Sequence, residues 1–170
     1  MRFDPVIHLP TAWISAAGEF VLYLFEGQLS LADMDRIQAH ASNWLLDHPG
    51  RRVDMAVVFP SGASMSAVER QRMVALIKLG EAERAASATV FLAEGLLASV
   101  QRSILTGIML LAPPPHPVKI FAHIPEAAHW LYPHLRRLTG PRLTLDVFVR
   151  AVDAHIAAFH ARRERGLMAV

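Results

Sequence analysis

The amino-acid sequence predicts an α/β domain, with a mixed, mainly parallel sheet of about five strands, flanked by helices and followed by an extra C-terminal helix. Segments with strand character alternate with segments of helical periodicity along most of the 170 residues. Hydrophobic residues make up 53% of the chain and charged residues 19%, which supplies a full core and excludes intrinsic disorder as the main state. The absence of cysteine excludes disulfides, thiolate nucleophiles and cysteine-bound zinc.

The first elements are expected to be a hairpin and a helix. Residues 12–15 and 20–25 are rich in aromatic and β-branched side chains and flank a short Ala-Gly turn, so they predict two strands that make the sheet mixed. Ser30 and Asp33 then have the spacing of a capping box, and apolar residues recur at helical spacing until Pro49. This pattern predicts a helix with one buried face.

The middle of the chain continues the alternation. Residues 53–59 and 88–93 are short apolar segments, and the first of them is typical of a strand buried on both faces of a parallel sheet. Between them, Ser66 and Glu69 form a second capping-box pattern at the start of a helix. Residues 96–111 carry an apolar stripe at helical spacing, which predicts a further helix.

One more strand and one more helix complete the expected domain. Residues 118–123 form the strand, and Pro125 suits the first turn of the following helix, which ends at Gly140. We therefore divide the chain into an α/β domain of residues 1–140 and a helical extension of residues 141–170.

The extension is the segment that most favours an interaction. Its helix, expected from residue 144 to about residue 165, carries the clearest apolar stripe of the sequence: Leu145, Val149, Val152, Ile156 and Phe159. Full burial of this stripe contributes on the order of 10 kcal/mol, which is too much apolar surface to leave in water. It can pack on its own domain, form a homodimer or another protein interface, or lie on an anionic membrane.

Charge and hydropathy restrict the partners and the compartment. The formal net charge of +2 is small, and the C-terminal arginines lack interleaved aromatic residues, so no nucleic-acid partner is predicted. The most apolar run, residues 104–114, is about half the ~20 residues that a transmembrane helix needs, and no signal peptide is recognisable. We expect a cytoplasmic protein without a transmembrane segment.

The sequence shows no catalytic or metal-binding motif. There is no Gly-x-Ser-x-Gly elbow, no phosphate-binding loop of the Walker type and no Gly-x-Gly-x-x-Gly after a strand. His116, His123, His129 and His134 lie close together in the sequence, but their spacing places no two of them on one helical face. We expect a protein that is not an enzyme and holds no metal or cofactor.

Three segments share a pattern with a known family. Residues 21–30 form a strand that enters the first helix through Gly-x-Leu-Ser, and residues 118–131 form a closing strand followed by Glu-Ala-x-x-Trp-Leu. Residues 101–107, which begin with Gln-Arg and end with Gly, precede the closing strand. Through these segments, residues 12–138 resemble the STAS-like families, which comprise the sporulation anti-sigma-factor antagonist fold and the SpoIIAA-like proteins.

The resemblance implies a non-enzymatic module that interacts with or regulates other proteins. Some relatives are controlled by phosphorylation of a serine at the start of the helix after the central strand, in an Asp-Ser-Ser-Gly context. The corresponding loop carries Ser61, Ser64 and Ser66 as candidate regulatory residues, but it lacks the aspartate and the paired serine. Ser66 also has the position of a simple helix N-cap.

The resemblance keeps a second class of function open, because SpoIIAA-like sequences are grouped with lipid-carrier folds of the Sec14 kind. Such a carrier needs an enclosed apolar pocket, for which the candidate lining residues are Trp13, Phe20, Phe91 and Met109. The sequence thus predicts a protein-interaction or regulatory module of STAS-like type in a bacterial cytoplasm. The alternative is a carrier or sensor of a small apolar ligand or lipid.

Overall fold

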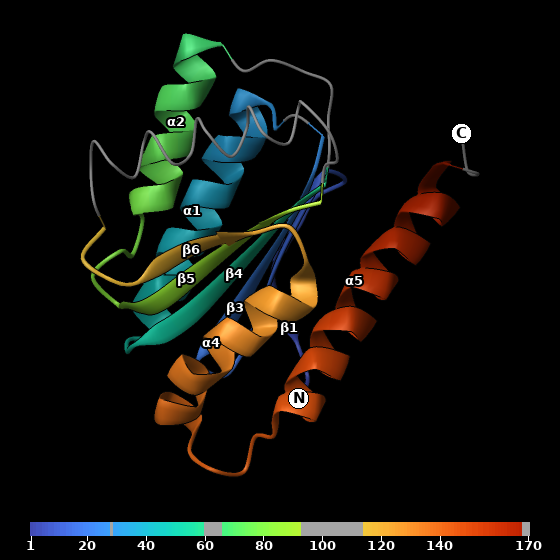
Figure 1. The fold of residues 1–170 in the computed structure, drawn as a ribbon. Helices are drawn as coiled ribbons and strands as arrows, with labels where there is room; N and C mark the ends of the chain where they lie inside the picture. Colours follow the sequence, from blue (N-terminus) through green and yellow to red (C-terminus); the bar gives the residue numbers. More distant parts are fainter. Residues whose placement is uncertain (28, 60–65, 93–113, 168–170) are drawn as a thin grey trace.

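The computed structural model describes residues 1–27, 29–59, 66–92 and 114–167 (Figure 1). The strands are β1 (Asp4–His8), β2 (Ala12–Ala17), β3 (Phe20–Glu26), β4 (Arg52–Phe59), β5 (Arg84–Phe91) and β6 (Val118–Phe121). The helices are α1 (Leu31–Asp47), α2 (Ala67–Lys78), α4 (Ile124–Thr139) and α5 (Leu145–Leu167). The helix expected over residues 96–111 lies outside the described residues.

The strands form one six-stranded sheet whose spatial order follows the sequence from β1 to β6. The pairs β1–β2 and β2–β3 are antiparallel, whereas β3–β4, β4–β5 and β5–β6 are parallel. The predicted fold class, a mixed and mainly parallel α/β sheet, is therefore confirmed.

The sheet has one more strand than the sequence predicts. The additional strand is β1, which contains Pro5 and is followed by Pro10, two residues that argue against a strand in the middle of a sheet. Here β1 lies at the edge, where it pairs only with β2 and its register shifts between Pro5 and Ile7. Proline is tolerated at this place because an edge strand has ladder hydrogen bonds on one side only.

The helices cover the two faces of the sheet in pairs (Figure 1). Side chains of β3 alternate between the faces: Phe20 and Leu22 belong to the core beneath α4 and α5, whereas Val21 belongs to the core beneath α1. Both clusters are continuous, because most inward positions of the central strands are apolar and fully buried. The result is a three-layer domain with the sheet in the middle.

Two of the predicted helix starts are confirmed in detail. The Ser30 hydroxyl accepts a hydrogen bond from the Asp33 N–H at 3.0 Å at the start of α1. At the start of α2, the Ser66 hydroxyl accepts from the Glu69 N–H, and the Glu69 carboxylate accepts from the Ser66 N–H at 2.7 Å. These caps satisfy backbone donors that the first turn of a helix leaves without a partner.

The C-terminal helix packs on the chain's own sheet. Phe148, Val152, Ile156 and Phe159 are buried in the core that also contains residues of β2, β3 and β4. Leu145 and Val149, at the start of the stripe, are half-buried. The sequence leaves three arrangements open for this stripe, and the structure shows the first of them, in which the stripe packs on its own domain.

Candidate functional site

A shallow hollow of about 680 Å³ lies where the edge strand β6 meets the first two turns of α4. It is lined by Lys119, Phe121, Pro125, Glu126, His129 and Trp130. We call this surface the β6–α4 groove. Its residues come together because β6 leads directly into α4, with Pro125 in the first turn of the helix.

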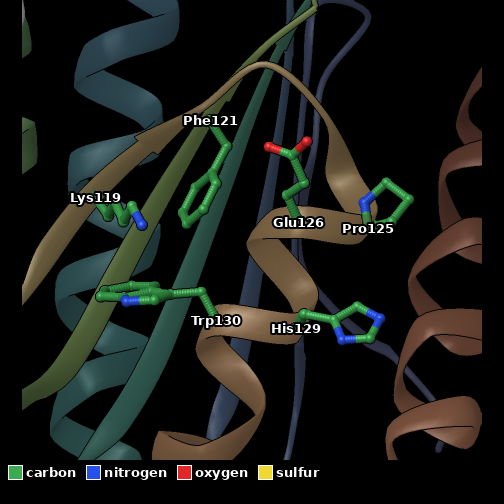
Figure 2. Close-up of a pocket in the computed structure, with 6 residues that line it drawn as sticks. All are labelled: Lys119, Phe121, Pro125, Glu126, His129 and Trp130. Carbon is green, nitrogen blue, oxygen red and sulfur yellow. The ribbon is translucent and has the colours of Figure 1, made fainter.

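Aromatic side chains form the floor of the groove (Figure 2). The rings of Phe121 and Trp130 lie 5.7 Å apart between centroids and are inclined by 50°. Phe121 is buried, whereas Trp130 is half-buried and keeps part of its indole in contact with solvent. The Nζ of Lys119 lies 5.2 Å from the centroid of the Phe121 ring, a distance typical of a cation–π contact.

Charged groups of both signs surround this aromatic floor. Lys119, Glu126 and His129 are all exposed. Figure 2 shows Lys119 on the same side as Phe121 and Trp130, Glu126 pointing up beside Phe121, and His129 pointing away from Trp130. The groove thus offers an aromatic contact area with a cation on its strand side and an anion on its helix side.

The groove lies at an open edge of the sheet. Within the part of the chain that the structure describes, β6 pairs with β5 on one side and with no strand on the other. An edge strand presents backbone N–H and C=O groups that can pair with an extended segment of another chain. Lys119 stands on this edge strand, which is a common way of keeping an edge from pairing with copies of itself.

A second, smaller hollow of about 460 Å³ lies at the other end of α4. Its lining residues are Tyr132, Pro133, Arg136, Arg137, Gly140 and Pro141. The hydroxyl of Tyr132 donates a hydrogen bond to the Leu143 carbonyl at 2.9 Å and so ties α4 to the segment before α5. This hollow is basic and lacks the strand edge that distinguishes the β6–α4 groove.

The serines predicted as a regulatory loop are only partly described. Ser61 and Ser64 lie outside the described residues. Ser66 is exposed and is the N-cap of α2, with the capping box described above. Its hydroxyl therefore has a structural partner in the helix that it starts.

The residues predicted to line a ligand pocket do not come together in one cavity of the described chain. Trp13 and Phe20 are buried beneath α5, where their rings contact Phe159 at 5.3 Å and Phe148 at 4.8 Å, respectively. Phe91 is half-buried at the end of β5, and Met109 lies outside the described residues. The first two side chains are thus packed against a helix of the same chain.

A buried cluster of charged and polar side chains lies on the other face of the sheet, under α2. Arg84 donates through Nε to the Asp54 carboxylate at 2.5 Å and through Nη2 to the Leu79 carbonyl at 2.9 Å. Arg52 donates to the Gly80 carbonyl at 2.6 Å, and its Nε lies 3.6 Å from Asp54. Burial, followed by the negative charge of Asp54, raises the pKa of Tyr23 far above its ordinary value.

Sequence reasoning missed this cluster. The signal was the presence of Arg52, Asp54 and Arg84 inside or beside strands that are otherwise apolar. Arg84 also explains why β5 begins four residues before the predicted strand at residue 88, since its guanidinium is held by Asp54 of β4 and by the carbonyls of the preceding turn. The cluster fastens the α2–β5 turn to the sheet.

A second polar cluster joins both ends of the chain and was also missed. The Nε2 atoms of His8 and His155 lie 3.0 Å and 2.9 Å from the hydroxyl oxygen of Ser15. Ser15 is fully buried, and 140 residues separate it from His155 in the sequence. We call this the His–Ser–His cluster.

Two features are absent from the described residues. No group of three or more His, Asp or Glu side chains in these ranges converges as a metal site would require. In the same part of the chain, no helix has the length and the apolar character needed to cross a membrane.

Comparison with known proteins supports the fold. An uncharacterised protein of the DUF3478 family with a SpoIIAA-like fold, from Shewanella loihica PV-4, has a similar structure with a TM-score of 0.52 and 14% sequence identity. The match covers 71% of this chain and 92% of that one. No protein-family model matches the sequence, and no curated protein matches it either. The likeness therefore shows the architecture, a SpoIIAA-like fold.

Proposed function

We propose that this SpoIIAA-like domain is a non-enzymatic module that binds another protein, and that the β6–α4 groove is its docking surface. The observation that carries the proposal is the coincidence of an open strand edge with a half-exposed tryptophan and charges of both signs. The STAS-like fold supports the same class of function. A regulatory role and a cytoplasmic location belong to this proposal.

The strand edge and the tryptophan favour an extended segment of a partner protein. Such a segment would pair with the backbone of β6 and continue the sheet by one strand. Trp130 lies beside that edge and would supply the kind of large, rigid anchor that dominates many protein interfaces. Lys119 and Glu126 would then select the charge pattern of the partner and its direction along β6.

The test is photo-crosslinking in the bacterium that produces the protein, with a benzophenone amino acid in place of His123, an exposed residue between β6 and α4 that does not line the groove. We expect a discrete protein adduct whose yield falls at least about tenfold when Trp130→Ala is added, because loss of a central anchor commonly costs about 2 kcal/mol or more.

Two controls make the result specific. Trp44→Ala removes a half-buried tryptophan from α1, on the opposite face, and should leave the yield unchanged. The crosslinker at His40, an exposed residue of the same helix, should give no such adduct. An adduct that is insensitive to Trp130→Ala, or turnover of a substrate by the purified protein, would contradict the proposal.

A further inference from the structure

Two neighbouring strands of the N-terminal part of the chain and the C-terminal helix meet at one buried hydroxyl group. Ser15 lies on β2, His8 on the edge strand β1 and His155 in the middle of α5. Both imidazole Nε2 atoms lie within 3.0 Å of the Ser15 oxygen, and that residue is fully buried. A substrate therefore cannot reach the hydroxyl while α5 is in place, which sets this arrangement apart from a catalytic Ser–His pair.

The hydrogen-bonding capacity of serine restricts the protonation of this cluster. A hydroxyl donates one hydrogen bond and accepts up to two. With both imidazoles neutral, the serine donates to one of them and accepts from the other, so all three groups are satisfied. When both imidazoles are protonated, both can only donate, the serine proton loses its acceptor and two positive charges face each other.

The surroundings add no negative charge that would offset this. Burial lowers the pKa of His155, and burial, then His155, then Arg162 lower the pKa of His8. Arg162 of α5 lies over the ring of Trp13, which itself stacks on His8 at 4.1 Å.

The other charged groups on the packed elements are turned to solvent or belong to other contacts. On β1, Asp4 is exposed and forms an ion pair with Arg2 at 3.7 Å. On α5, Asp153 is exposed, and His160 packs its ring on Phe59. On this face, β2 and β3 contribute Ser15 and apolar or aromatic side chains, and the one acidic residue, Glu26 at the end of β3, lies beside Phe59 of β4.

We propose that the His–Ser–His cluster is a pH-sensitive clamp that holds α5 on the sheet, and that protonation of His8 and His155 loosens the C-terminal half of the helix. The loosened helix uncovers the apolar side chains beneath it, Trp13 among them. The clamp thus regulates access to a second face of the domain, independently of the β6–α4 groove.

The direction and size of the effect follow from linkage. The undocked histidines have the ordinary pKa of 6.5 and the docked ones a lower value, so the undocked state binds more protons and docking weakens as the pH falls below 6.5. At pH 5.5, a histidine that stays neutral while docked changes the opening equilibrium by about tenfold, and the pair by up to about 100-fold.

Hydrogen exchange of the full chain, corrected for intrinsic exchange rates, tests the clamp. Between pH 7.5 and pH 5.5, we expect the opening equilibrium of amides in the C-terminal half of α5 to rise at least about tenfold. The amides of α1 should change much less. In His8→Gln/His155→Gln the response should be lost, because neither glutamine titrates in this range.

Further variants keep the test independent of misfolding. His155→Gln alone should keep only part of the response, and His40→Gln, which removes an exposed histidine from α1, should behave as the parent chain does. A parent chain whose α5 amides ignore pH overturns the proposal. The proposal is also overturned by a double variant that remains folded by circular dichroism and whose α5 amides show the same increase in opening between pH 7.5 and pH 5.5 as the parent chain.

Discussion

At the scale of single residues, the fold depends on positions whose surroundings allow one residue type only, and Gly80 is such a position. Gly80 has a positive φ of 64°, and a Cβ built there would lie 2.1 Å from Nη2 of Arg52 and 2.9 Å from Cδ1 of Leu45. The same Arg52 nitrogen donates to the Gly80 carbonyl. The glycine thus permits both the turn after α2 and the approach of a buried guanidinium.

We predict that Gly80→Ala destabilises the protein by about 3 kcal/mol, because it combines a strained backbone with displacement of a buried charge. Gly18→Ala is the matched control: its φ of 59° is similar, but nothing lies within 4 Å of the added Cβ. The control should cost only about 1 kcal/mol. Urea unfolding measures both values, and equal losses would show that the contact with Arg52 is unimportant.

The buried ion pair gives a second prediction at this scale. Asp54→Asn leaves two buried guanidinium groups without their carboxylate and should destabilise the protein by about 3–5 kcal/mol. Asp35→Asn removes the partner of Arg72 in an exposed pair and should cost less than about 1 kcal/mol. Thermal unfolding compares the two variants. If Asp54→Asn left the stability of the protein unchanged, the cluster would not be held together by charge.

At the scale of elements, local patterns were predictable from the sequence and distant pairings were not. The capping residues Ser30 and Ser66 marked the starts of α1 and α2, because a cap involves neighbours three residues apart. The strand β1 was missed, because its prolines are tolerated only at an edge, and the edge is decided by the whole sheet.

The same distinction applies to the candidate sites. In the sequence, Glu-Ala-x-x-Trp-Leu indicates only a family resemblance, and the fold is needed to show that its tryptophan lies beside the open edge of β6. The contact between Ser15 and His155 spans 140 residues and leaves no local pattern in the sequence. The stripe of α5 was predicted, except that Phe148, one of its buried members, was overlooked.

The role of α5 as part of the core yields a prediction at the scale of this element. A chain that ends at Gly140 loses Phe148, Val152, Ile156 and Phe159, which together contribute on the order of 8 kcal/mol of burial. This is comparable to the whole stability of a typical domain, so the shortened chain should aggregate or unfold without cooperativity.

A chain that ends after Arg162 keeps these four side chains and should unfold cooperatively. Light scattering behind size exclusion, followed by thermal unfolding, distinguishes the outcomes. A stable, monomeric chain of residues 1–140 would show that α5 is dispensable for the fold.

At the scale of the whole molecule, the domain has two regions that differ in structure. On one face, α5 closes the sheet and joins the two ends of the chain through Ser15. At the opposite edge, β6 and α4 leave an aromatic groove in contact with solvent. The function that we propose depends on this second region, whereas the clamp controls the first.

The most direct test of the docking surface is a map of the contact with the partner captured by crosslinking. ¹H–¹⁵N spectra of the labelled chain should show shift changes concentrated at the amides of β6 and the first two turns of α4, and these changes should disappear with Trp130→Ala. Changes centred instead on α2, or spread over the exposed side of α5, would contradict the account.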